Sequence, residues 1–308
     1  MGEPQAELRA AVGALLNRNL METPATGNAE LDLLVQEIAE LRPLPSVALR
    51  VLKIAESEHF SAHELAQAIG TDAALTAKML RLANSAYYGF PRRISTVRDA
   101  VVLLGFRAVR SATLAACVIE TMPRGTHIED RGFWHFSITV AMLAEVLARS
   151  ARRHTDEAYT AGVLHNIGRL ALDQHRPDQF RRAVLLAQRE QMTLPEAERA
   201  LLGFTDAQLG GALALHWNFP AELAEAVADH QQPLDALDDR TSLTALVVRA
   251  REFARDRGMT DGVEPAAERE PDRGWLIAPV APVLAQAGGI EGVIERAAAF
   301  IDQTMGSS

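Results

Sequence analysis

The chain is nearly free of cysteine, because Cys117 is the only one among its 308 residues. No disulfide can form within it, which is typical of a reducing compartment, and we expect the protein to be cytoplasmic. It also lacks a long apolar run, since its longest uncharged stretch, residues 274–290, is interrupted by two prolines and a Gly-Gly pair. Such a stretch cannot form a membrane-spanning helix. The first residues lack the basic and apolar segments of a signal peptide, so we expect neither secretion nor a membrane partner.

Strand patterns are missing as well, because no region shows sustained alternation of β-branched and polar residues. Helix signals are present instead. Ser61 with Glu64, and Thr96 with Asp99, are spaced as capping pairs that satisfy the first amides of a helix. Gly70 is placed to adopt a left-handed conformation where the first of these helices ends. With 48% hydrophobic residues to form a core, the sequence predicts an all-α fold.

Positive charge is in short supply, with 31 Lys and Arg against 40 Asp and Glu and a net charge of −9. Residues 64–70 and 72–83 have the spacing of a helix-turn-helix, which makes DNA binding an alternative function. The second of these helices, however, offers only Lys78 and Arg81 as cations. Neutralisation of phosphates supplies most of such affinity, so we expect no specific DNA binding and interpret the pattern as ordinary packing of two helices.

In the stretch Ala161–Leu170, His165 is followed directly by Asn166. This stretch resembles a helix of the metallophosphohydrolases, with one ligand changed. A catalytic site of this kind has Asp after the His, because a carboxylate supplies the negative charge that holds and bridges divalent ions. An amide oxygen can coordinate a hard cation, but it brings no charge and cannot act as a base. The sequence therefore predicts a weakened site.

Several segments, taken in order, resemble the HDOD domain, the HD-related output domain of bacterial signalling proteins. The segments are Leu41–Pro45, Ala48–Leu52, Leu75–Gly89, Ala100–Gly105, Gly132–Ser137, the helix with His165 and Asn166, Gly210–Leu213 and Trp217–Pro220. Within them, the Asn-Ser-x-Tyr-Tyr-Gly element at residues 84–89 is specific to the family. The resemblance covers residues 30 to 258 and implies a role in signal transduction.

The resemblance also implies an all-α, multi-helical HDOD-type fold, in which an N-terminal helical subdomain packs on a degenerate HD-like helical subdomain. We place a loosely held segment at residues 1–29 and the HDOD domain at 30–258. This domain divides into an N-terminal helical half, 30–124, and a degenerate HD-like half, 125–258. Residues 259–308 are expected to form a polar linker and a C-terminal helix that docks back on the core, because apolar residues recur there at helical spacing.

Carrying the HD metal ligands over by this resemblance exposes three departures. Phe136 stands where the first His would be, and Asn166 replaces the Asp that pairs with His165. Arg251 stands at the position of the final Asp, and an arginine cannot lose its proton and would repel a divalent cation. His135 is not an easy replacement, because one residue along a helix rotates the side chain by about 100°. We therefore expect no metal, no cofactor and no catalytic residue in a protein that is not an enzyme.

The other histidines leave alternatives open. His165 lies among apolar neighbours, so we expect it to be buried, neutral and satisfied by one hydrogen bond, for instance to the adjacent amide. A residual metal-dependent phosphohydrolase is the alternative, and it would need help from His135, Asp229 or His230. His216 and His230 fit such a site and fit the exposed end of a helix equally well.

The element that we expect to bind a partner comes from the first half. Its candidate binding residues are Asn84, Ser85, Tyr87, Tyr88, Arg92 and Arg93. Tyr and Arg suit protein interfaces and also anionic ligands such as nucleotides. The alternative is that the tyrosines pack between the two halves while the arginines are solvated. We interpret the protein as a non-catalytic regulatory module whose partners are other signalling proteins, with a nucleotide as the alternative ligand, and the sequence leaves its oligomeric state open.

Overall fold

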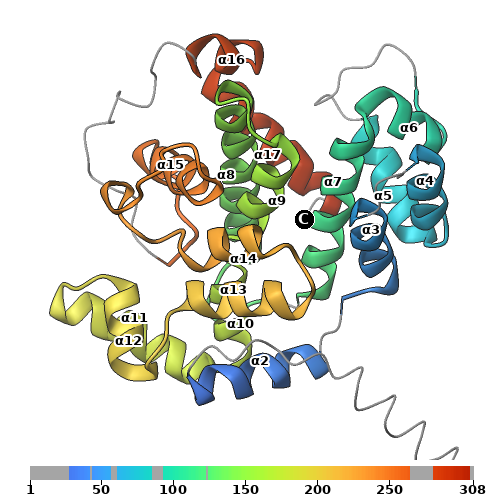
Figure 1. The fold of residues 1–308 in the computed structure, drawn as a ribbon. Coiled ribbons are helices and arrows are strands. Elements are labelled where there is room, and N and C mark those ends of the chain that lie inside the picture. The colour runs from blue at the N-terminus through green and yellow to red at the C-terminus, as the bar shows by residue number, and fades with distance from the viewer. Residues whose placement is uncertain are drawn as a thin grey trace, which may run out of the picture.

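The computed structural model describes residues 28–41, 44–56, 61–84, 93–122, 124–263 and 280–305. These residues form helices and contain no strand, so the predicted all-α fold is confirmed (Figure 1). The helices are α2 (Ala29–Leu41), α3 (Ser46–Glu56), α4 (Ala62–Gly70), α5 (Ala73–Ala83), α6 (Val97–Leu104), α7 (Phe106–Thr121), α8 (Asp130–Ser150), α9 (Thr155–Leu164), α10 (Ile167–His175), α11 (Pro177–Glu190), α12 (Leu194–Leu202), α13 (Asp206–His216), α14 (Ala221–Ala228), the 3₁₀ helix η1 (Leu234–Ala236), α15 (Leu243–Asp256), α16 (Val280–Gln286) and α17 (Gly289–Met305).

The capping signals place the helix starts correctly. The Ser61 hydroxyl accepts a bond from the backbone N–H of Glu64, and the Glu64 carboxylate accepts one from the N–H of Ser61, so the capping box of α4 is complete. The prediction for Gly70 was wrong. This residue is the last of α4, and Thr71 follows in a right-handed conformation with φ −73°. The backbone N–H of Thr71 and its hydroxyl bond to carbonyls of the last turn, so no left-handed residue is needed there.

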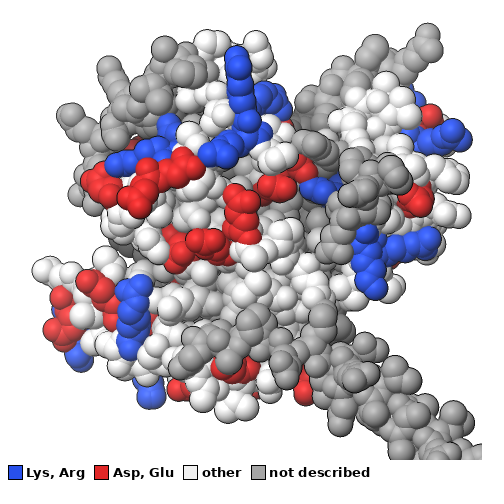
Figure 2. All heavy atoms as spheres, viewed as in Figure 1, with Lys and Arg blue, Asp and Glu red and all other residues white. Residues whose placement is uncertain are grey.

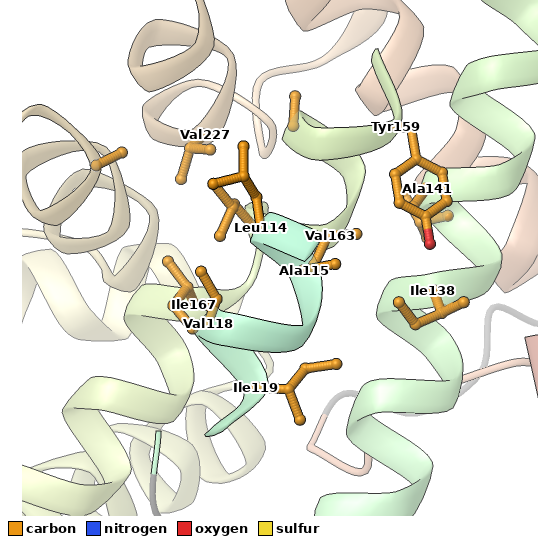
Figure 3. Close-up of a cluster of buried hydrophobic side chains, with 14 of the residues drawn as sticks. Leu114, Ala115, Val118, Ile119, Ile138, Ala141, Tyr159, Val163, Ile167 and Val227 are labelled. Carbon is orange, nitrogen blue, oxygen red and sulfur yellow. The ribbon is translucent and has the colours of Figure 1, made fainter. Parts of the chain in front are cut away.

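The two halves meet along α7, which joins the α3–α6 group to the helices around α8 and α9 (Figure 1). Figure 3 shows the apolar side chains of α7 among those of α8, α9, α10 and α14. The labelled members of this cluster are Leu114, Ala115, Val118, Ile119, Ile138, Ala141, Tyr159, Val163, Ile167 and Val227. All of these labelled side chains are buried, with at most 8% of any of them exposed. Because burial of apolar surface drives folding, α7 serves as the core helix between the halves.

Polar contacts across the same junction fix how α7 lies on α9. Arg110 forms an ion pair with Asp156, a buried residue in the first turn of α9. The Ser111 hydroxyl donates to the backbone oxygen of Asp156 at 3.2 Å. The Arg110 side chain is therefore committed to the junction.

The first and last helices reach across to the other group. α2, from the range assigned to the first half, packs on α13, and Asn28 Nδ2 donates to the backbone oxygen of Gly203 at 3.1 Å. α17 packs on both α8 and α5, with Val293, Phe300 and Ile301 buried. The exact limits of the predicted halves and of the C-terminal linker stay a prediction. None of the described helices combines the length and the hydropathy that crossing a bilayer requires.

Candidate vestigial metal site

His165 and Asn166 lie at the junction of two helices rather than within one. His165 follows the last residue of α9, and Asn166 precedes the first residue of α10. The His165 side chain is fully buried, and its Nδ1–H donates to the backbone oxygen of Gly162 at 2.6 Å. Burial of a neutral, hydrogen-bonded histidine agrees with expectation, but the bond goes to a backbone carbonyl and not to Asn166, because the turn between the helices directs the amide away.

Two aromatic rings close the space around His165. The Phe136 ring, on α8, lies with its centroid 5.8 Å from that of His165, and the His230 ring lies at 5.0 Å in an edge-on arrangement. His230 is itself buried, and its Nδ1–H donates to the backbone oxygen of Val227 at 2.7 Å. Sequence reasoning had left His230 undecided between a site and an exposed helix end. The sequence could not predict whether His230 is buried, because a residue just after a short helix can point into the core or into solvent.

The environment keeps His165 uncharged. Burial lowers the pKa of His165 well below its usual 6.5, and the neighbouring His230 and the positive charge of Arg251 lower it further. The Gly162 carbonyl and the carboxylate of Asp261 act in the opposite direction and are outweighed. Arg251 of α15 is thus close enough to His165 for its charge to lower the pKa of the imidazole. The position that matches the final Asp of the HD ligands therefore lies near His165.

A buried ion network lies beside this histidine pair. Arg169 of α10 is fully buried and donates to one carboxylate oxygen of Asp206, at the start of α13, and to one of Asp261, in the segment after α15. Asn166 Nδ2 also donates to Asp261, at 3.2 Å. Gln231 Nε2 donates to the second oxygen of Asp206 at 2.6 Å. Buried charges are tolerated in an apolar interior only when paired in this way.

Sequence reasoning missed this network. Arg169 lies among Ile167, Leu170 and Leu172, in a helix that is apolar nearly all round. A charged residue in such a helix indicates a buried ion pair, and this was the signal that the sequence offered. The partners could not be read from the chain, because Asp206 and Asp261 are 37 and 92 residues away from Arg169.

The residues at the ligand positions do not fit a divalent metal. Phe136 offers no donor atom, and Asn166 offers an amide oxygen that carries no charge. Arg251 adds a positive charge next to the only imidazole that matches the family pattern. The carboxylates of the adjoining network, Asp206 and Asp261, form ion pairs with Arg169. In the ranges that the structure describes, no three His, Cys, Asp or Glu side chains are grouped so that they could hold a metal ion.

Comparison with known proteins now decides the family. The sequence model of the HDOD domain matches residues 41–233. The chain belongs to the HDOD domain family. An HDOD domain protein of unknown function from Geobacter sulfurreducens has the same fold, with 25% identity and a TM-score of 0.71 over 88% of this chain and 97% of that one.

Other relatives of this HDOD protein carry different names. A protein from Shewanella amazonensis, provisionally named a phosphohydrolase, is 24% identical with a TM-score of 0.69, over 90% of this chain and 98% of that one. One from Marinobacter aquaeolei, provisionally named a signal transduction protein, is 23% identical with a TM-score of 0.67, over 88% of this chain and 65% of that one. An uncharacterized protein of Treponema pallidum is 22% identical over 75% of this chain, which spans less than half (45%) of that relative.

His135 lies apart from the vestigial site of this HDOD domain, as the helical rotation predicts. Its Nε2 is 3.3 Å from the backbone oxygen of Ile294 in α17. The side chain lines a cavity of about 260 Å³ between the start of α8 and α17, together with Glu129, Ala298 and Ile301. His216 is half-buried at the end of α13, and burial lowers its pKa.

The candidate binding element of the HDOD domain is only partly described. Ser85, Tyr87, Tyr88 and Arg92 lie outside the described residues. The structure describes its two ends, Asn84 and Arg93, both of which are exposed.

The side chain of Asn84 is engaged within the chain. Its Nδ2 donates to the backbone oxygens of Leu80 and Ile94, each at 2.7 Å, while its Oδ1 accepts from the N–H of Ile94 at 2.7 Å. An amide has two donors and one acceptor oxygen, so these bonds occupy most of its capacity. Asn84 therefore fixes the base of the element, where the chain leaves α5 and returns to α6.

Proposed function

We propose that this HDOD protein is a non-catalytic regulatory module that acts by binding other signalling proteins. The observation that carries the proposal is the set of side chains at the HD ligand positions. Phe136 has no donor atom, the Asn166 amide is hydrogen-bonded to a carboxylate, and Arg251 contributes a positive charge. Hydrolysis of this class needs a metal that lowers the pKa of a bound water, and Phe136, Asn166 and Arg251 supply neither an imidazole nor a carboxylate to hold that metal.

The partner surface that we propose lies around Arg93 and the start of α6. Arg98, Val102 and Leu103 of α6 are exposed, with 70% of Val102 and 52% of Leu103 accessible to solvent. Arg98 and Val102 are four residues apart and therefore share one face of the helix. Exposed apolar side chains beside arginines are typical of protein interfaces. A nucleotide is the alternative ligand for the same arginines.

This surface differs in charge from the other half of the molecule. Figure 2 shows Asp and Glu gathered across the middle of one face, over α14 and α9. Burial raises the pKa of Glu157 on α9, and the neighbouring charges of Asp156 and Glu222 raise it further. We therefore expect an acidic segment of a partner to approach the arginines near α6 and to be repelled by the acidic face.

Binding to duplex DNA is less well supported. Of the two cations on the candidate recognition helix, now α5, Lys78 is largely buried and forms an ion pair with Glu120 of α7. Arg81 alone is exposed. One cation cannot neutralise the several phosphates on which such affinity depends.

The first test addresses catalysis. We expect the purified protein to contain no stoichiometric divalent metal and to leave cyclic dinucleotides and simple phosphodiesters intact, because its ligand positions cannot hold the metal. Elemental analysis and hydrolysis assays with added Mg²⁺ or Mn²⁺ measure both. About one or two transition-metal ions per chain, together with hydrolysis that is lost in His165→Ala, would contradict the proposal.

The second test addresses the partner surface. Arg92→Glu with Arg93→Glu should lower partner capture at least about tenfold, because like charges at an interface are strongly disfavoured. The matched control is Arg181→Glu with Arg182→Glu, an exposed arginine pair on α11 that undergoes the same change of charge. Both variants should melt within about 2 °C of the parent, since exposed charge changes cost little. Capture from a native lysate that is unchanged in the folded Arg92/Arg93 variant would remove these residues from the surface.

A further inference from the structure

Arg169 is the largest fully buried side chain among the described residues. Its side chain is 0% exposed, and its two carboxylate partners are 1% (Asp206) and 3% (Asp261) exposed. The three residues come from different elements, namely α10, the first residue of α13 and the segment that follows α15. One guanidinium thus joins three pieces of chain that are far apart in the sequence.

The geometry of the partners requires a cation at this place. Each carboxylate carries a charge that costs several kcal/mol to bury unless a positive group or several donors compensate it. Asp206 receives Gln231 Nε2 and Asp261 receives Asn166 Nδ2, and both of these donors are neutral. Arg169 is the positively charged donor that both carboxylates share. A divalent metal performs this task in enzymes that collect carboxylates around one ion.

We propose that Arg169 is a built-in cation that replaces the metal as the organiser of the HD-like half. Its charge holds Asp206 and Asp261 together, and it cannot dissociate because it is tethered to α10. The proposal rests on one part of the proposed function, the absence of a bound divalent metal, and is independent of the partner surface. It also explains the change at position 166, since a carboxylate there would face the Asp261 carboxylate at the 3.2 Å now spanned by a hydrogen bond, whereas the amide donates to it.

Asp261 gives the network a second consequence. The residue lies outside the range 41–233 that matches the family, yet it is buried and bonded to Arg169 and Asn166. Its Oδ1 also accepts the backbone N–H of Val263 at 3.1 Å. The segment 257–263 is therefore latched onto the vestigial site by charge.

The main experiment replaces the cation. Arg169→Met keeps much of the volume and removes the charge, so two buried carboxylates are left uncompensated and the melting temperature should fall by roughly 6 to 15 °C. The matched control is Arg176→Ala, which removes an arginine from a half-exposed ion pair with Glu37 and should shift it by no more than about 2 °C.

A charge-compensation series separates charge from packing. If Arg169 acts through its charge, adding Asp206→Asn and Asp261→Asn to Arg169→Met should restore at least half of the lost melting temperature. In Arg169→Ala, guanidinium chloride at on the order of 10 mM should raise the melting temperature by a few degrees through binding to the folded state, while the parent shows no rise. A triple variant as unstable as Arg169→Met, with no guanidinium effect, would overturn the proposal.

A milder variant, Asp261→Asn, tests the network even if the Arg169 variants do not fold. Asp261→Asn leaves the pair of Arg169 with Asp206 intact and releases only the latch. We expect amide hydrogen exchange in residues 257–263 to speed up by about tenfold or more, while exchange in α13 stays within a factor of two. Unchanged hydrogen exchange in residues 257–263 would show that Asp261 does not hold the segment. In a separate measurement, a rise in the melting temperature of the parent on addition of Mg²⁺ or Mn²⁺ would show that a metal, not Arg169, is the organiser.

Discussion

Adding a second proton to the His165 imidazole is unfavourable, because the ring is fully buried beside a second histidine and an arginine. At the residue scale, His165 is therefore part of the protein interior. Its Nδ1–H bond to the Gly162 carbonyl fixes the tautomer that a metal-binding histidine also uses. A position that matches a metal ligand by family resemblance thus contributes to packing in this protein.

This burial makes stability depend on pH with a defined sign. Burial, His230 and Arg251 lower the pKa of His165 well below 6.5, so the unfolded chain binds this proton more tightly than the folded one. Stability from this residue is full above about pH 6.5 and is lost as the pH falls, by at most about 1.4 kcal/mol per pH unit. Urea unfolding at several pH values between about 5 and 7.5 measures the slope. The slope should become shallower in His165→Gln, and an identical slope in that variant would refute the assignment.

At the scale of elements, close helix contacts fix the architecture. Gly162 of α9 faces α8, and a Cβ at this position would lie 2.4 Å from Ala141 Cα and 2.8 Å from Ala141 N. Both atoms belong to the backbone, so neither can rotate away. The absence of a side chain at residue 162 therefore sets the distance between α8 and α9, which carry Phe136 and lead into His165.

Two glycine substitutions test this contact against a matched site. Gly162→Ala should lower the free energy of unfolding by about 2 kcal/mol or more, because α8 and α9 must separate. Gly70→Ala, in the last position of α4, meets no atom within 4 Å and should raise it by about 0.5 to 1 kcal/mol. Chemical denaturation of both variants gives the comparison. A loss of stability in Gly70→Ala equal to that in Gly162→Ala would mean that the tight helix crossing is not the cause.

At the scale of the whole molecule, the two helical groups behave as one packed body. α7 contributes a buried apolar face and the Arg110–Asp156 pair to the junction, and α17 spans α8 and α5 (Figures 1 and 3). A displacement of one group must therefore disturb buried contacts of the other.

Much of the molecule could be predicted from the sequence because the signals are local. The capping box at Ser61, the N-cap at Thr96, the helical spacing of apolar residues and the family motifs predicted an all-α HDOD fold. The changed ligand positions, Phe136 and Asn166, were also visible, since they needed only a motif in register. Local sequence determines these features because capping and periodicity act within a few residues.

Only the tertiary structure decided what surrounds His165 and Asn166. Arg169 bonds to carboxylates 37 and 92 residues away, and His230 lies against His165 although 65 positions separate them in the numbering. Asn84, expected to bind a partner, proved to be engaged with Ile94 and Leu80. Such contacts depend on how whole helices pack, and a buried charge gives no sign in the sequence of which distant opposite charge will compensate it.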